Sequence, residues 1–133
     1  MSFIKFENVK ISGIACKVPK QKFLLEESNL FKSSKDVKKF SKITGIKEKR
    51  HANNSTTTLD LCLDSANQLI SELDWDKTEI DLIVFVTQTP DYPVPNNAII
   101  FQDRLGVKKD SMCFDVPLGC SGYVYGLSIV FSL

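Results

Sequence analysis

The stretch Met112-Cys-Phe-Asp-Val-Pro-Leu-Gly-Cys-Ser-Gly-Tyr-Val-Tyr-Gly-Leu-Ser-Ile-Val-Phe-Ser-Leu133 decides the fold of this 133-residue chain. Its first five residues, 112–116, are apolar except for Asp115, and this pattern predicts a strand covered on both faces. A turn with Pro117 and Gly119 follows. Residues 120–133 are then apolar around most of a helical circumference, which is typical of a helix inside a larger assembly. The stretch therefore predicts a buried strand that turns directly into a buried helix.

The same order of elements precedes this stretch. Residues 57–73 predict a helix, because their apolar side chains recur at spacings of three and four. Residues 82–86 are almost entirely apolar and predict a second buried strand. A short helix is expected between Pro95 and Gly106. This alternation predicts an α/β fold in three layers, with a mixed, mostly parallel sheet.

The first third of the chain is less regular. Residues 3–14 predict a strand or the first arm of a hairpin. Residues 22–40 predict an irregular helical segment, in which Ser33 and Asp36 supply a capping signal. Residues 42–46 predict a short extended segment around a glycine.

Composition limits the classes of protein. With 43% hydrophobic and 25% charged residues, the chain has the composition of one soluble globular domain over residues 1–133. No run approaches the ~20 apolar residues that span a bilayer. The first residues lack the features of a signal peptide. These observations predict a cytoplasmic protein that does not bind a membrane.

Charge is unevenly distributed along the chain. Residues 1–50 hold 13 Lys and Arg against 5 Asp and Glu, whereas residues 51–133 hold 4 against 11. In one interpretation the two parts face each other or simply solvate the surface. In the other, the basic first third binds an anionic ligand.

The four cysteines are Cys16, Cys62, Cys113 and Cys120. They show no CxxC spacing, so we expect free thiols and no metal site. Cys62 lies on an apolar helical stripe and Cys113 inside a strand, which indicates core positions. Cys120 follows a strand and opens a helix, where unpaired backbone N–H groups stabilise a thiolate. It is therefore either a nucleophile or a buried structural cysteine.

Several segments together carry a resemblance to a known family. They are Ile11-Ser-Gly-Ile14 with Val18-Pro19, Thr44-Gly45-Ile46 with Glu48 and Arg50, Ile80-Asp81-Leu-Ile-Val84 with Thr87-Gln-Thr-Pro-Asp91, Pro95 and Ala98 with Gln102, Leu105 and Gly106, and Phe114-Asp115 with Cys120, Gly122, Tyr123, Tyr125 and Leu127. In this order and spacing the sequence resembles β-ketoacyl-[acyl-carrier-protein] synthase III, of the thiolase-like superfamily. The resemblance covers essentially the whole chain and corresponds to the N-terminal half of such an enzyme.

The resemblance implies an acyltransferase in fatty-acid or related acyl-chain synthesis. Cys120 would accept an acyl group from a CoA thioester, and the acyl-enzyme would condense with malonyl-[acyl-carrier-protein] to give a 3-oxoacyl product. A His and an Asn from the C-terminal half would stabilise the transition states. The sole histidine here, His51, does not occupy such a position, so we expect it to be a surface or packing residue. The implied partners are acyl carrier protein, acyl-CoA or acyl-ACP and a second copy in a homodimer, without a bound cofactor, metal or nucleic acid.

The chain departs from the family where the donor binds. The Trp and Arg that flank the CoA adenine in the family are replaced by Lys39 and Ile43. We expect donor binding at Lys39, Phe40 and Arg50 instead, with acyl-CoA or acyl-ACP as donor. Three other interpretations stay open: a thiolase-fold enzyme with another acyl acceptor, a non-catalytic acyl-binding partner subunit, and a hydrolase that pairs Cys120 with the distant histidine, which neither order nor spacing supports.

Overall fold

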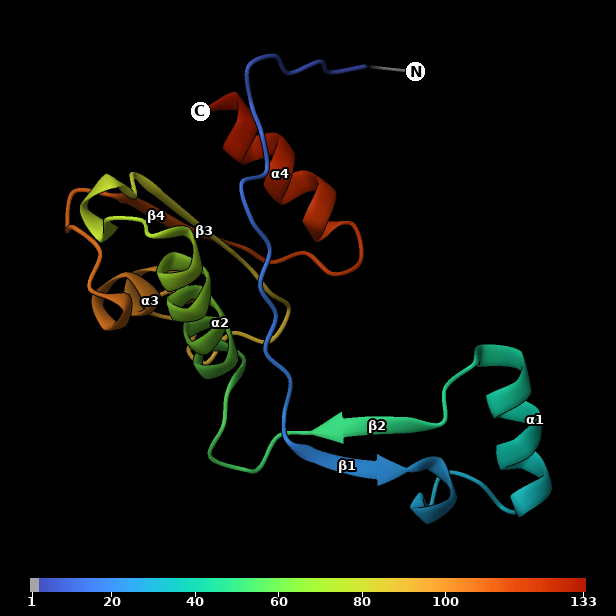
Figure 1. Cartoon of the computed structure of the whole chain (residues 1–133). Helices are drawn as coiled ribbons and strands as arrows, with labels where there is room; N and C mark the ends of the chain where they lie inside the picture. Colours follow the sequence, from blue (N-terminus) through green and yellow to red (C-terminus); the bar gives the residue numbers. More distant parts are fainter. Residues whose placement is uncertain (1–2) are drawn as a thin grey trace. The chain divides into compact units, whose positions relative to one another are not determined.

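The computed structural model describes residues 3–133. These residues form two compact units (Figure 1): one comprises Val18–Thr57, and the other comprises residues 3–17 together with Thr58–Leu133. We describe each unit by itself and call them the small unit and the large unit.

The large unit contains the two predicted buried strands. Strands β3 (Leu82–Val86) and β4 (Met112–Val116) pair in parallel, with Leu82 opposite Met112 and Val86 opposite Val116. Helices α2 (Thr58–Leu73), α3 (Asn97–Leu105) and α4 (Gly122–Ser132) surround them, and a short 3-10 helix, η2 (Lys77–Glu79), precedes β3. The expected order of helices and strands is therefore confirmed.

Three layers make up this unit. Because strand side chains alternate between faces, Ile83 and Phe85 of β3 enter the core formed with α2 and α3. That core comprises Leu59, Ile83, Phe85, Ala98, Phe101, Leu105 and Val107. The opposite face of β3, with Val84 and Val86, packs against α4. Figure 1 shows α4 on one side of the strands and α2 and α3 on the other.

Residues 3–17 correct one prediction. They were expected to hold a strand at residues 3–14, but the described chain contains no such strand. The segment instead passes α2, where Gly13 lies against Leu69 and Leu73, and α4, where the ring of Phe6 packs 5.7 Å from that of Phe131. A strand needs a neighbour for its backbone N–H and C=O groups, and residues 3–133 offer this segment none.

The small unit holds an antiparallel pair and one helix. Strands β1 (Gln21–Leu24) and β2 (Glu48–His51) pair in antiparallel register. A 3-10 helix, η1 (Leu25–Glu27), and helix α1 (Ser34–Thr44) connect them. The capping signal is confirmed, because the Ser33 hydroxyl accepts a hydrogen bond from the Asp36 N–H at 3.3 Å.

Two further predictions for this unit are wrong in part. Residues 22–40 are not helical from their start, because the first of them pair as a strand and the helix begins only at Ser34. The helix also continues through Thr44 into the segment expected to be extended, and it ends at Gly45, whose φ of 75° is in the left-handed region that favours glycine. The first error arises because the pairing partner β2 lies beyond the local pattern, whereas the second placed the end of the helix too early, before its glycine cap.

The α/β class is confirmed, with parallel and antiparallel pairing in two separate sheets. No helix among residues 3–133 is both long and apolar enough to cross a membrane.

Candidate functional site

Cys120 lies in a tight turn between β4 and α4. The Leu118 N–H donates to the Val116 carbonyl at 2.9 Å, and the Gly122 N–H donates to the Gly119 carbonyl at 2.8 Å. Cys120 was expected to open the helix, but α4 begins two residues later, at Gly122, because this separate turn comes first. The thiol is exposed at the junction of strand and helix.

The turn is contacted by a residue that sequence reasoning missed. Gln88 follows the end of β3, and its side chain covers Gly119: a Cβ atom on that glycine would lie 2.6 Å from the Gln88 Oε1 atom. Neighbouring parallel strands end at the same edge of a sheet, where ligand sites of α/β proteins form. The position of Gln88 just after β3 was the signal that could have identified it.

An apolar groove runs from this turn along α4. Its volume is about 420 Å³. The lining side chains come from β3 (Val84 and Val86), from the turn (Leu118) and from α4 (Tyr123, Leu127 and Val130). The exposed thiol therefore lies next to a surface that suits hydrocarbon.

A polar network holds the loop that follows β3. The Thr89 N–H donates to the Thr87 hydroxyl at 3.0 Å, and the Asp91 N–H donates to Oδ1 of Asn97 at 3.1 Å. The Asp115 carboxylate accepts the N–H groups of Asn97 and Ala98 at 2.8 and 2.7 Å. Asp115 thus ties the strand that leads to Cys120 to the start of α3.

The other thiols differ from Cys120 in their surroundings. Burial raises the pKa of Cys62, and the nearby Asp91 carboxylate raises it further. Burial also raises the pKa of Cys113. Cys16 is exposed. The prediction that Cys62 and Cys113 are core residues agrees with their partly buried packing against the core cluster.

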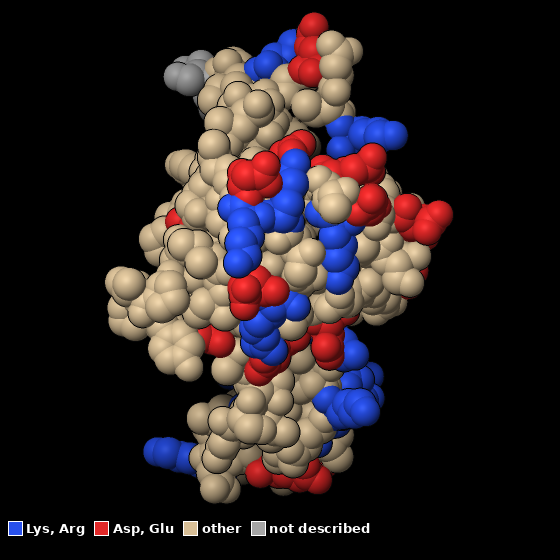
Figure 2. Space-filling view, turned by 90° about the vertical axis from the view of Figure 1, so that its left-hand side faces the viewer, with Lys and Arg blue, Asp and Glu red and all other residues tan. Residues whose placement is uncertain are grey.

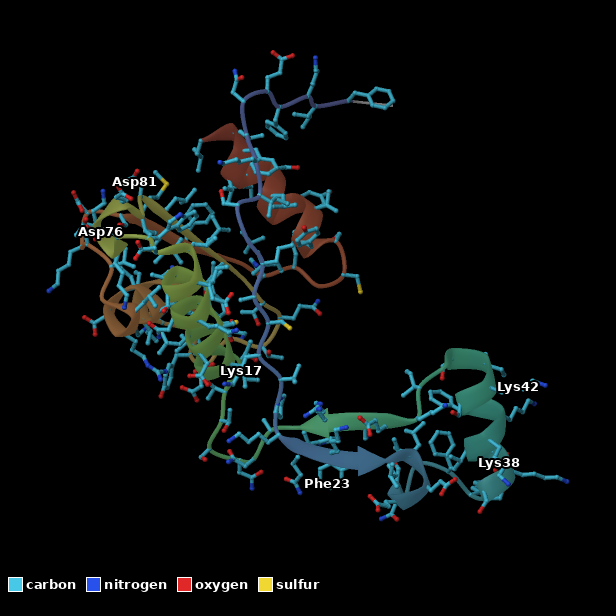
Figure 3. The ribbon with its side chains drawn as sticks, in the orientation of Figure 1. Lys17, Phe23, Lys38, Lys42, Asp76 and Asp81 are labelled. Atoms are coloured by element: carbon cyan, nitrogen blue, oxygen red, sulfur yellow. The ribbon has the colours of Figure 1, made fainter. Side chains whose placement is uncertain are left out.

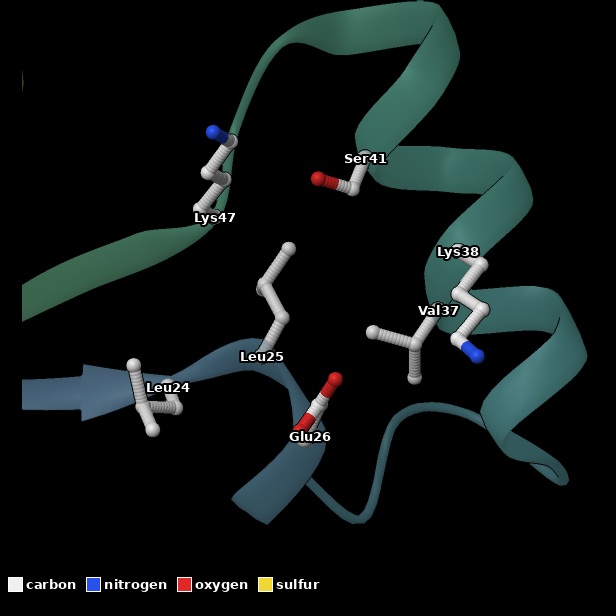
Figure 4. Close-up of a pocket in the computed structure, with 7 residues that line it drawn as sticks. All are labelled: Leu24, Leu25, Glu26, Val37, Lys38, Ser41 and Lys47. Carbon is white, nitrogen blue, oxygen red and sulfur yellow. The ribbon is translucent and has the colours of Figure 1, made fainter.

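The three residues predicted to bind the donor all lie in the small unit. Each has different surroundings, and in the described chain no hydrogen bond, ion pair or ring contact joins any two of them. Lys39 is exposed on α1, and the Phe40 ring packs 5.2 Å from that of Phe31. The Arg50 Nη1 atom donates to the Pro19 carbonyl at 2.8 Å. A cavity of about 340 Å³ lies between η1 and α1 (Figure 4). Its wall includes Leu25, Val37, Lys38, Ser41 and Lys47, and none of the three predicted residues.

His51 pairs with an aromatic ring. Its imidazole packs edge-to-face on Phe23, with ring centroids 4.9 Å apart. This contact fits the expected packing role. No cluster of three potential metal ligands occurs within residues 3–133.

The surface of the large unit carries charges of both signs. Figure 2 shows acidic and basic side chains interspersed on one face. Arg104 of α3 contacts Asp60 of α2 at 2.7 Å, and Lys17 contacts Asp64 at 3.4 Å. The Lys108 ammonium donates to Asp81, and this hydrogen bond raises the pKa of Lys108.

Curated relatives match nearly the whole chain. A β-ketoacyl-[acyl-carrier-protein] synthase III from Lactobacillus helveticus is 35% identical over 127 residues, which cover 96% of this chain and 38% of the relative. A protein of the same name from Ehrlichia canis is 38% identical over 119 residues, which cover 90% of this chain and 37% of the relative. The chain therefore spans little more than a third of the length of these relatives. No protein-family model matches the sequence.

Solved structures share the fold. A 3-oxoacyl-(acyl-carrier-protein) synthase III superposes with a TM-score of 0.83 at 36% identity, over 92% of this chain and 36% of that one. A variant of Xanthomonas campestris OleA superposes with a TM-score of 0.85, over 98% of this chain and 40% of that one. At 24% identity, the second likeness shows the fold alone.

Proposed function

This chain is a homologue of β-ketoacyl-[acyl-carrier-protein] synthase III along nearly its whole length, and from that relationship we propose that it carries the acyl-accepting nucleophile of a condensing acyltransferase. The observation that carries the proposal is the place of Cys120. It is an exposed thiol on a strand-to-helix turn beside an apolar groove.

The first step is acyl transfer to sulfur. The Cys120 thiolate attacks the carbonyl carbon of an acyl thioester, the carbon–sulfur bond to the donor breaks, and the donor leaves as a thiol after taking up a proton. Within residues 3–133 the N–H of Cys120 donates to no acceptor, which leaves it able to bind the oxyanion. The groove along α4 would take the acyl chain.

The second step forms a carbon–carbon bond. Malonyl-[acyl-carrier-protein] loses CO₂, and the electron pair of the broken bond attacks the acyl carbon on Cys120. The thiolate is expelled, and a 3-oxoacyl-[acyl-carrier-protein] leaves. By family resemblance, a His and an Asn would stabilise the enolate and the oxyanion.

Donor binding belongs to the small unit in this proposal. Lys39 on α1 supplies an exposed positive charge for the phosphates of acyl-CoA or of a carrier-bound pantetheine. The half-buried ring of Phe40, which packs on that of Phe31, would offer the donor its exposed side. Arg50, an exposed residue whose Nη1 atom donates to the Pro19 carbonyl, is the third residue of the proposed donor site.

We infer a homodimer, because β4 pairs only with β3 in the described chain and α4 exposes Tyr123, Val124 and Tyr125. We also propose a cytoplasmic location, which the free cysteines support. Light scattering at micromolar concentration that detects only monomers would contradict the dimer.

The test of function follows labelled acyl groups in the full chain. Radiolabelled acetyl-CoA is added, and the acylated residue is identified by mass spectrometry. We expect label on Cys120, its loss in Cys120→Ala, and its retention in Cys16→Ala, which removes another exposed thiol. Label that persists in Cys120→Ala would overturn the proposal.

A further inference from the structure

The side chain of Gln88 extends from the end of β3 over the turn that carries Cys120. Both ends of its amide lie against Gly119, because a Cβ atom on that glycine would lie 2.6 Å from Oε1 and 2.8 Å from Nε2. A carbon–carbon single bond at Cα is about 1.5 Å long, so the amide lies within about 4.3 Å of the Gly119 Cα atom. Cys120 is the next residue, and the amide therefore lies beside the proposed nucleophile.

One backbone carbonyl ties the position of Gln88 to that of the turn. The Val116 carbonyl accepts the N–H of Thr87 at 3.2 Å and the N–H of Leu118 at 2.9 Å. Thr87 directly precedes Gln88, and Leu118 begins the turn that leads to Cys120. The backbones of the two segments are therefore held relative to each other before any substrate binds, as preorganised catalysis requires.

The two segments meet at one end of the sheet. Strands β3 and β4 are parallel, and Val86 lies opposite Val116 in the last pair of their register. Figure 3 shows that the chain leaves both strands at this end, whereas Asp81, which precedes β3, lies at the other end. Ligands of α/β proteins bind outside the carboxyl ends of the strands. Gln88 and Cys120 are thus placed together where a substrate is expected.

The amide of Gln88 has no partner within the described chain. Among residues 3–133 it forms no hydrogen bond, whereas the amide of Gln68, on α2, donates to Glu72 at 2.8 Å. Gln88 is also exposed, so a bound substrate can replace the water at its amide. Its N–H groups are therefore available to a ligand of Cys120.

We propose that the Gln88 amide donates a hydrogen bond to the thioester carbonyl oxygen while the acyl group is transferred to Cys120. This inference rests on the proposed function. As sulfur attacks the carbonyl carbon, an electron pair moves to the carbonyl oxygen, and a donor next to that oxygen stabilises the transition state. The amide acts beside the backbone N–H of Cys120, and it gives up no proton. Rotation of the amide presents its N–H end, because Gln carries a donor and an acceptor on one group.

Two other roles of Gln88 would have different consequences. If the side chain only covers Gly119, a side chain of similar length without an amide serves equally well. If the amide stabilises the thiolate itself, it affects every reaction of Cys120, including those that form no oxyanion. Iodoacetamide provides such a reaction, since the thiolate attacks its CH₂ group and expels iodide. The test therefore compares two electrophiles on the same thiol.

The main variant is Gln88→Met in the full chain. It nearly keeps the length of the side chain and removes both hydrogen-bonding ends of the amide. The matched control is Gln68→Met, the same exchange at an exposed position of α2. Acetyl-N-acetylcysteamine supplies the acyl group without a CoA or a protein carrier, and mass spectrometry follows acetylation of Cys120. Circular dichroism verifies the fold of each variant.

We expect acetylation of Gln88→Met to be about tenfold slower or worse. Its alkylation by iodoacetamide, and both reactions of Gln68→Met, should change by less than about twofold. Equal acetylation of Gln88→Met and the wild type would overturn the inference and leave the proposed function in place. So would an equal slowing of acetylation and alkylation. No acetylation of Cys120 in the wild type would overturn the proposed function, and the inference with it.

Gly119→Ala provides an independent variant of the same contact. The added Cβ displaces the flexible end of Gln88 from the turn, so acetylation of Cys120 should slow. In the Gly119→Ala background, Gln88→Met should then have little further effect on the rate, because the amide has already moved away. Rates that show fully additive effects of the two substitutions would overturn the inference.

Discussion

At the scale of single residues, the four thiols of this chain differ in exposure, and burial raises the pKa of two of them, Cys62 and Cys113. Cys120 and Cys16 are exposed, whereas Cys62 and Cys113 pack against the core of the large unit. Only Cys120 also lies on a strand-to-helix turn beside a groove. Access and thiolate fraction together decide how fast a cysteine reacts.

The first prediction concerns the order of alkylation. With limiting iodoacetamide at neutral pH, Cys120 should react first in the full chain. Cys62 and Cys113 should react slowest, because a raised pKa leaves less thiolate at that pH and burial restricts access. Their rates should increase as the pH rises towards their pKa values. Peptide mapping by mass spectrometry gives the order, and earlier labelling of Cys16 or Cys62 would contradict the role of Cys120.

At the scale of elements, two contacts hold the helices that surround the site. Asp115 of β4 caps α3 through the N–H groups of Asn97 and Ala98. Gly122 and Gly126 allow α4 to approach Val86 of β3. The first contact joins α3 to β4, and the second joins α4 to β3.

The second prediction tests the cap. Asp115→Ala should lower the free energy of unfolding by about 1–3 kcal/mol, because two N–H groups lose an ionised acceptor. Asp115→Asn keeps one acceptor oxygen and should cost less. Urea denaturation followed by circular dichroism measures both. Equal stability of the alanine variant and the wild type would show that water replaces the cap at no cost.

The third prediction compares two glycines. A Cβ on Gly122 would lie 2.6 Å from Cγ1 of Val86, a stiff side chain, whereas a Cβ on Gly119 would meet the flexible end of Gln88. Gly122→Ala should therefore cost about 1–3 kcal/mol from overpacking, reduced by about 1 kcal/mol of helix propensity. Gly119→Ala should cost less than about 0.5 kcal/mol.

Thermal denaturation of both variants checks this order. The double variant with Val86→Ala should lose less stability than the sum of its single variants, because the shortened side chain makes room for the added methyl group. Strict additivity would mean that α4 does not contact β3 through Gly122.

At the scale of the whole molecule, the chain holds the exposed thiol proposed as nucleophile and the groove beside it, and it spans little more than a third of its relatives' length. In the proposed function, condensation also uses a His and an Asn that the family resemblance implies. Acylation needs mainly a thiolate and an oxyanion donor, whereas condensation also needs stabilisation of the enolate.

The fourth prediction follows for residues 1–133 expressed alone. With radiolabelled acetyl-CoA and malonyl-[acyl-carrier-protein], the chain should become acylated slowly on Cys120 and should release no 3-oxoacyl product. Loss of one oxyanion donor typically costs about 10²–10³ in rate, and several groups would be lacking here. Detectable 3-oxoacyl product would show that the remaining groups are not required.

The sequence alone determined α2, β3, α3 and β4, and with them the α/β class. Their apolar residues recur at helical spacing or in short continuous runs, and such patterns are local. The glycine at the end of α3 and the serine cap of α1 were equally readable, because a turn or a cap involves neighbours along the chain. Cys120 was recognisable by the strand and turn before it.

Only the tertiary structure decided the features that depend on distant partners. Residues 3–14 have the pattern of a strand but no neighbouring strand in the described chain, whereas residues 21–24 form one because β2 lies beside them. The contact of Gln88 with Gly119 and the cap that Asp115 places on α3 join residues 31 and 17 or 18 positions apart. Packing sets the backbone hydrogen bonds of strands and the contacts between side chains across a sheet edge. These partners cannot be deduced from the local spacing of residues.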